Sequence, residues 1–111
     1  MKKYTAKDFD KIRKLFKKCE ENKVIVANKV IDELIFLTNT LDELKFHVIN
    51  EGCIVDMQQG NYSIERENPA LKSYNATIKS YQNLLKQLFE LATDEDSKEI
   101  EDELEKFIRN E

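Results

Sequence analysis

Few side chains in this 111-residue sequence have the types and spacing that catalysis or metal binding needs. His47 is its one histidine, so a nucleophilic triad has no other imidazole base. It falls at the edge of an apolar helical stripe, where a structural role fits better. The adjacent acids Asp42-Glu43 and Asp94-Glu95-Asp96 have the pattern of solvated helix faces and helix starts. We therefore expect no catalytic residue, no cofactor and no enzymatic activity.

The cysteines and the hydropathy pattern bear on metals, redox state and location. Cys19 and Cys53 have no paired spacing, which predicts free thiols in a reducing compartment. A single histidine excludes a histidine-rich zinc site, and two distant cysteines are a weak metal signal, so we expect no metal. No apolar run follows Lys2-Lys3, and the longest uncharged apolar-rich stretch, residues 34–41, is eight residues long. These features predict a cytoplasmic protein with no membrane partner.

The best binding candidate is a row of lysines near the N-terminus. Spacings of four, three and four place them on one stripe of a helix: Lys7, Lys11, Lys14 and Lys18. Long cationic side chains in such a row can contact successive phosphates of double-stranded DNA without reading base sequence. A solvated helix face is the alternative interpretation, since lysine-rich helices are common.

The charge is distributed unevenly, although the formal net charge is only −4. Residues 1–23 hold nine basic and four acidic side chains, whereas residues 94–111 hold nine acids and three bases. A basic front and an acidic tail indicate two different partners, or one surface that meets itself in an oligomer.

Composition and periodicity predict an all-α fold. Two glycines and one proline are too few for a β-sandwich or barrel, and too few for a glycine-rich phosphate loop. We expect one antiparallel bundle of about four helices with two long central helices. The parts of this single domain, residues 1–111, are a basic helix within 1–23, a central helical hairpin at 24–92, an acidic helix at 93–111 and a small β-hairpin at 53–65. The strands of this hairpin are residues 54–57 and 62–65, joined by a loop of four residues.

More precise limits come from caps and apolar spacing. The first helix starts at a capping box on Thr5 and runs to about Asn22, the second covers about 24–50, and the third opens with Asn68 as its N-cap and Pro69. The last is capped by Thr93 or Asp94 and ends near residue 109. In each long helix, residues at alternating spacings of three and four form one continuous line, which we call its seam. In the first helix the seam consists of Ala27, Val30, Leu34, Leu37, Leu41, Leu44 and Val48. In the second it consists of Leu71, Tyr74, Ile78, Tyr81, Leu85, Leu88 and Ala92. Matched seams predict side-by-side packing.

A second apolar line lies on the first long helix, off its seam. Ile25 and Phe36 are 11 residues apart, with Phe46 near the same side. The first or the last helix could cover these side chains. The other interpretation is a subunit interface formed by Ile25, Phe36 and Phe46.

The connector between the long helices resembles a known family. Gly52 ends one helix, an aliphatic stretch and Gly60 follow, and Asn68, Pro69, Ala70 and Leu71 open the next helix. Over residues 44–91 this pattern is similar to the small terminase subunits of tailed phages. Residues 91–96 depart from the Gly-Leu-Thr-Pro turn that is common in that family.

The resemblance implies a non-catalytic DNA-packaging protein of a phage or prophage. Such a protein is a homo-oligomer in the bacterial host cytoplasm that binds viral DNA and recruits a large terminase subunit with ATPase and nuclease activity. On this interpretation the lysine row contacts DNA, and the acidic segment meets the large subunit. The alternatives are a helical adaptor or antitoxin-like protein of prophage origin, and a small transcriptional regulator.

Overall fold

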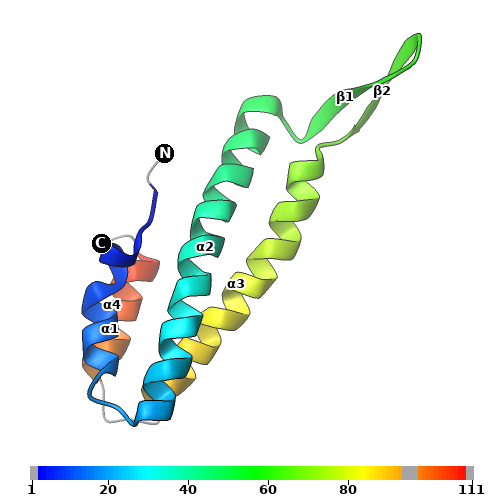
Figure 1. Ribbon diagram of the computed structural model, residues 1–111. Helices are drawn as coiled ribbons and strands as arrows, with labels where there is room; N and C mark the ends of the chain where they lie inside the picture. Colours follow the sequence, from blue (N-terminus) through cyan, green and yellow to red (C-terminus); the bar gives the residue numbers. More distant parts are fainter. Residues whose placement is uncertain (1–2, 94–97, 110–111) are drawn as a thin grey trace.

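The computed structural model describes residues 3–93 and 98–109. Within these ranges it contains a short 3-10 helix, four α-helices and one two-stranded antiparallel sheet (Figure 1). The elements in chain order are η1 (Ala6–Phe9), α1 (Asp10–Phe16), α2 (Glu21–Glu51), β1 (Ile54–Gln59), β2 (Tyr62–Glu67), α3 (Pro69–Thr93) and α4 (Lys98–Ile108). The expectation of an all-α architecture with two long central helices and a small hairpin is confirmed.

The two long helices, α2 and α3, run antiparallel along the whole molecule (Figure 1). The predicted seams face each other, but they are buried unequally. Near one end the seam is fully buried at Ala27, Leu34 and Leu88. Toward the hairpin the seam residues are only half-buried, as at Leu44 and Leu71. The difference follows from what covers the pair, because two helices alone cannot enclose a side chain on all sides.

The cover is supplied by α1 and α4, which pack together against one end of the α2–α3 pair (Figure 1). The four helices and η1 meet in one core, whose largest fully buried side chains are Phe9, Phe16, Ile31, Leu34, Leu88, Ile100 and Leu104. We call this part the four-helix end. Beyond it the α2–α3 pair and the hairpin project alone, and the chain measures 63 × 23 × 17 Å. Its radius of gyration, 18.0 Å, exceeds the roughly 13 Å of a compact chain of this length.

The segment before η1 is fixed to α2 by a pair of amide hydrogen bonds. The backbone N–H of Tyr4 donates to Oδ1 of Asn39 at 2.7 Å, and Nδ2 of Asn39 donates to the Tyr4 carbonyl at 2.8 Å. The ring of Tyr4 then meets Phe107 of α4 edge to face, with centroids 5.7 Å apart. Phe107 also packs on Phe9 at 4.6 Å. These contacts join three segments that are distant in sequence, namely the N-terminal segment, α2 and α4.

The first helix differs from its predicted form. The carboxylate of Asp8 accepts the Thr5 N–H at 2.9 Å, as the capping box requires, but the first turn is 3-10 and α1 ends at Phe16. The expected helix to residue 22 is wrong because the chain must reverse after Phe16 for α1 to pack beside α2. A short turn at 17–20 makes this reversal, and α2 begins at Glu21, three residues before the predicted start.

The predicted start of the last helix falls at the edge of the described residues. Of its two expected caps, Thr93 is the final residue of α3, and Asp94 lies outside the described residues. The helix α4 is described from Lys98 to Ile108 and has Glu99 and Glu101 in its first turn. Acidic side chains at that position are favourable toward the positive end of the helix dipole.

Asn68 holds the connector between α2 and α3 together. Its side-chain Oδ1 accepts the Ala70 N–H at 3.0 Å, which confirms the predicted N-cap of α3. Its Nδ2 donates to the Gly52 carbonyl at 2.9 Å, and its backbone N–H donates to the Cys53 carbonyl at 2.7 Å. Asn68 is 3% exposed. One buried amide therefore ties the end of α2 to the start of α3.

Glycine is required where α2 ends. Gly52 has φ 92° and ψ 167°, a backbone region that is essentially limited to glycine. An added Cβ would lie 3.5 Å from the Ile54 carbonyl oxygen, which is an ordinary contact. The cost of a side chain here is therefore conformational strain rather than a clash.

The hairpin has longer strands and a tighter turn than predicted. Gln59 pairs with Tyr62, which leaves a loop of two residues in place of the expected four. Gly60, with φ 59°, permits this tight reversal. The pairing puts Val55, Met57, Tyr62 and Ile64 on one face, and Asp56, Glu65 and Glu67 on the other. The hairpin is thus amphipathic, and its second strand is exposed along its full length.

We expect Asn68→Ala to lower the free energy of unfolding by about 1–3 kcal/mol, because the helix cap is lost and the Gly52 carbonyl loses its donor. Asn68→Asp keeps the acceptor for Ala70 but not the donor, so its loss should be smaller. Urea unfolding followed by circular dichroism measures both. The exposed Asn75→Ala on α3 is the control and should not lower the free energy of unfolding, because alanine is the better helix former. Equal effects of Asn68→Ala and Asn75→Ala would contradict the assigned role of Asn68.

Candidate functional site

Three features of the surface are candidates for function: the predicted lysine row, the exposed apolar residues of α2 and a cleft beside the four-helix end. The predicted lysines do not share one helix. Lys7 belongs to η1, Lys11 and Lys14 belong to α1, and Lys18 lies in the turn after it. All four are exposed, so the predicted stripe is a set of exposed ammonium groups spread over η1, α1 and the turn after α1. We call these four residues the cationic surface.

The acidic helix α4 lies directly beside this cationic surface. Nζ of Lys11 is 3.2 Å from Oε1 of Glu103, whose side chain is 18% exposed. Lys106 approaches the same oxygen at 3.5 Å. Burial by itself would raise the pKa of Glu103, but the hydrogen bond from Lys11 and the charge of Lys106 leave the pKa below its ordinary value. The basic front and the acidic tail thus meet within one chain.

A second ion pair joins α1 to α2. Nη2 of Arg13 is 2.6 Å from Oδ1 of Asp32, and its Nη1 donates to Oδ1 of Asn28 at 3.0 Å. The Arg13 side chain is largely covered. Arg13 and Lys11 therefore hold α1 in place. Within residues 3–93 and 98–109, no ion pair involves Lys7, Lys14 or Lys18, so these are the candidates for contact with an external anion.

The predicted interface residues are exposed rather than covered. Ile25, Phe36 and Phe46 are 51%, 64% and 53% exposed, so neither α1 nor α4 covers them. Ile25 and Phe36 lie in line on α2, since 11 residues make nearly three turns. Phe46 lies about 80° away from that line at 100° per residue. It is nearer the face of Ile49, which is 72% exposed.

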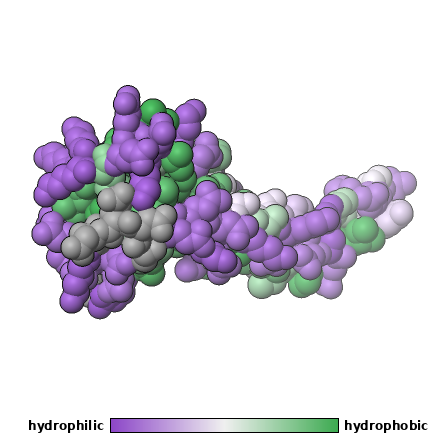
Figure 2. All heavy atoms as spheres, turned by 90° about the horizontal axis from the view of Figure 1, so that it is seen from below, coloured by the Kyte–Doolittle hydropathy of each residue, from purple (hydrophilic) through white to green (hydrophobic). Residues whose placement is uncertain are grey.

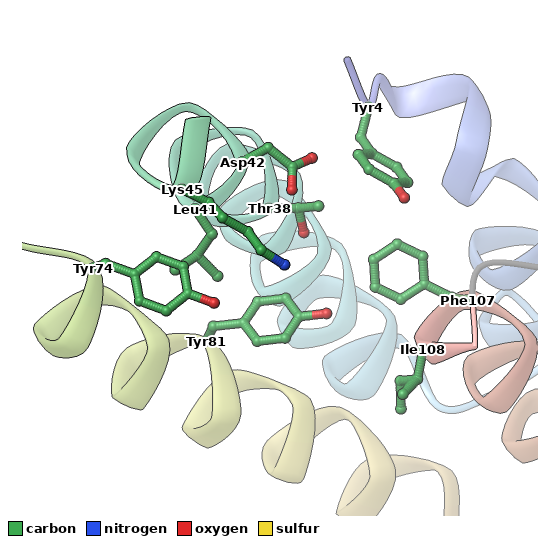
Figure 3. A pocket seen from close by; sticks show the side chains of 9 residues that line it. All are labelled: Tyr4, Thr38, Leu41, Asp42, Lys45, Tyr74, Tyr81, Phe107 and Ile108. Carbon is green, nitrogen blue, oxygen red and sulfur yellow. The ribbon is translucent and has the colours of Figure 1, made fainter. Parts of the chain in front are cut away.

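A cleft of about 190 Å³ lies between the α2–α3 pair, the end of α4 and the N-terminal segment (Figure 3). Its apolar wall comes from Leu41 of α2 and from Phe107 and Ile108 of α4. Its polar wall consists of Tyr4, Thr38, Asp42, Lys45, Tyr74 and Tyr81. Four separate segments of the chain therefore build this small, partly apolar depression.

The hydroxyl groups deep in the cleft are fixed by the helix behind them. Thr38 donates its hydroxyl proton to the Leu34 carbonyl at 2.6 Å, and the Tyr81 hydroxyl is hydrogen-bonded to Thr38. Burial raises the pKa of Tyr81 above its ordinary value, an effect that the Thr38 hydrogen bond reduces and the charge of Asp42 adds to. Tyr81 is therefore an uncharged phenol at neutral pH.

Sequence reasoning assigned Tyr74 and Tyr81 to the α3 seam and did not predict the cleft. Both do lie on the seam side of α3. A signal was present, because these are the two seam positions of α3 that carry hydroxyl groups, and Thr38 lies among the aliphatic residues of α2. What the sequence could not show is that α4 ends beside them.

The remaining sequence candidates are surface groups. His47 is about half exposed, and its Nδ1 lies 3.7 Å from a carboxylate oxygen of Glu51, one turn further along α2. Cys19 is half-buried and Cys53 is exposed, and both are free thiols. In the described ranges, no cluster of histidine, cysteine or acidic residues has the makings of a metal site. None of the described helices combines the length and apolarity of a membrane span.

Comparison with known proteins adds no assignment. No family model matches the chain, and neither a curated protein nor a solved structure shows significant similarity to it. The resemblance to small terminase subunits therefore stays a prediction from residues 44–91.

The Lys11–Glu103 contact predicts a pH-dependent contribution to stability. Because the pKa of folded Glu103 is lowered, its contribution is present above the unfolded pKa of about 4.3 and is lost as pH falls through the folded pKa. Glu103→Gln should lower the thermal midpoint at pH 7, and this difference from the wild type should vanish near about pH 3. The exposed Asp102→Asn on the same helix is the control. A difference that persists unchanged at low pH would contradict the ion-pair explanation.

Proposed function

We propose that the chain is a non-catalytic small terminase subunit of a phage or prophage, which binds viral DNA and recruits the large ATPase and nuclease subunit for genome packaging. The connector carries this proposal. The residues of the resemblance, Gly52, Gly60 and Asn68 to Leu71, form one continuous unit that joins two long antiparallel helices. Each has a structural task there, from the glycine-only conformation at Gly52 to the cap at Asn68.

The distribution of charge supports DNA binding at the four-helix end. Lys7, Lys14 and Lys18 are exposed there, and contacts of lysine with phosphate need no precise docking geometry. Lys3 and Lys17 are exposed in the same region of the chain. On this proposal Lys11 has a divided role, since its ammonium also holds α4 through Glu103.

The exposed apolar residues support assembly into a homo-oligomer. Exposed apolar side chains on one line of a helix form a surface that a neighbouring subunit can cover. Ile25 and Phe36 form the line on α2 that we assign to this contact. Seen from the four-helix end, the projecting part shows hydrophobic residues among hydrophilic ones (Figure 2).

A helical adaptor or antitoxin-like protein of prophage origin is the second candidate. The Lys11–Glu103 ion pair favours it, because α4 neutralises part of the cationic surface that DNA would use. In this case the apolar residues of α2 would meet a different protein.

DNA binding can be tested with a variant that spares the α1–α4 contact. Changing Lys7, Lys14 and Lys18 to Glu should weaken binding to a duplex and reduce the slope of log affinity against log salt by about 2–3, because each lost phosphate contact removes about 0.9. Fluorescence anisotropy between about 50 and 200 mM salt measures both quantities. Lys72, Lys79 and Lys86, all exposed on α3, are changed to Glu in the matched control. If the two triple variants bind alike, the assigned surface is wrong.

Self-association can be tested independently of DNA. Ile25→Ser with Phe36→Ser should shift the protein toward monomer, because the exposed apolar line is removed while the core is untouched. Sedimentation velocity over a range of protein concentrations gives the mass. Val26→Ser with Ile64→Ser, which removes two other exposed apolar side chains, is the control. A wild-type chain that stays monomeric at high concentration would argue against the terminase proposal and leave the adaptor.

A further inference from the structure

We propose that the cleft beside the four-helix end binds an apolar monocarboxylate, an acid whose body is one aromatic ring or a branched aliphatic group. Such a group occurs as a free small acid and as the C-terminal residue of a polypeptide. This inference does not rest on DNA packaging, because no residue of the cationic surface lines the cleft.

The size and apolar wall of the cleft select the body of the ligand. An apolar cavity of about 150 Å³ holds one benzene molecule, so about 190 Å³ accommodates one ring and a short acid chain. Leu41, Phe107 and Ile108 supply apolar contact on the side of α4. The ring of Phe107 faces the opening between α2 and α4, where a second ring could pack against it (Figure 3).

The carboxylate is selected by the donors on the opposite wall. The ammonium group of Lys45 and the hydroxyl group of Tyr74 both point into the cleft (Figure 3). The Tyr81 hydroxyl lies between them and α4, on the side of Thr38, whose own hydroxyl proton is donated to the Leu34 carbonyl. We assign Lys45 and Tyr74 as the donors to the ligand carboxylate. A carboxylate can accept one hydrogen bond from each, and the bond from the ammonium group is the stronger because its donor is charged.

Asp42 limits the ligand to one negative charge. Its carboxylate lies at the rim nearer Tyr4, one turn before Lys45 on α2 (Figure 3). Among the described residues, neither Asp42 nor Lys45 forms an ion pair. A second carboxylate on the ligand would approach Asp42 and be repelled. The cleft should consequently discriminate against dicarboxylates.

Binding should also stabilise the four-helix end. The walls belong to α2, α3, α4 and the N-terminal segment, so the cleft exists only while α4 and Tyr4 are docked. A ligand that binds only this folded arrangement raises its stability by linkage. At ten times its dissociation constant, it increases the folding equilibrium constant about 11-fold.

The test is a titration of the full chain with 3-phenylpropionate, followed by amide NMR shifts, with 3-phenylpropanamide as the neutral probe. We expect saturable binding of the acid in the millimolar range and at least about a fivefold preference for the acid over the amide. Lys45→Met should abolish this preference, because the apolar wall remains and the charge is gone. Tyr74→Phe should reduce it in part. Lys72→Met, an exposed lysine of α3 outside the cleft, is the matched control and should keep the full preference.

Two further probes separate the sources of the acid and test the role of Asp42. A short peptide that ends in phenylalanine with a free carboxylate is compared with its amidated form. If the free peptide binds at least as tightly as 3-phenylpropionate, the ligand is a chain terminus; if it binds more weakly, the ligand is a free acid. Phenylsuccinate should bind more weakly than 3-phenylpropionate, and Asp42→Asn should reduce that difference. The proposal is overturned by an absence of saturable shifts around Tyr74 and Phe107, or by an acid preference that survives in Lys45→Met.

Discussion

The structure depends on a mismatch in helix length. α2 has 31 residues and α3 has 25, whereas α1 has seven and α4 has 11. At 1.5 Å per residue, α2 extends about 46 Å, but α1 and α4 can cover less than half of that length. The same seam is therefore a closed core at one end and a half-buried strip at the other. Because α1 and α4 cover only one end of the α2–α3 pair, the hairpin projects at the other end and the cleft forms beside the end of α4.

Local features of the fold were accessible from the sequence because they depend on neighbouring residues. The alternation of three and four predicted both long helices, and Asn68-Pro69 predicted the start of α3 to the residue. The position of the connector between α2 and α3 could be predicted because Gly52 and Gly60 are the only glycines of the sequence. The end of α1 was not, because the apolar spacing continues from Phe16 to Cys19 while the chain already turns. Apolar spacing does not reveal where the chain reverses after Phe16, because this reversal is caused by the packing of α1 against α2.

The candidate sites likewise depend on tertiary contacts that the sequence patterns do not predict. The lysine row was visible as a spacing, but its electrostatic setting depends on Glu103, more than 80 residues away in sequence. The cleft was not predicted at all. Tyr74 and Tyr81 fit a seam pattern, and only the end of α4 at Ile108 turns that seam into the wall of a depression. The electrostatic setting of the lysines and the cleft both depend on contacts between segments that are distant in sequence. Spacing patterns along the chain do not predict such contacts.

The separation of these surfaces constrains how the protein can work. Lys7, Lys14 and Lys18 belong to the four-helix end, and the hairpin projects from the far end of the chain, whose longest extent is 63 Å (Figure 1). The cleft lies between the α2–α3 pair, the end of α4 and the N-terminal segment. The buried amide of Asn68 holds the hairpin to both long helices, so force or binding at the hairpin acts on α2 and α3 together. At the other end, Phe107 links the cleft to the N-terminal segment and to Phe9 in the core. The helix α4 therefore lines the cleft with Phe107 and Ile108 and contacts the cationic surface through Glu103, whose carboxylate is 3.2 Å from Lys11.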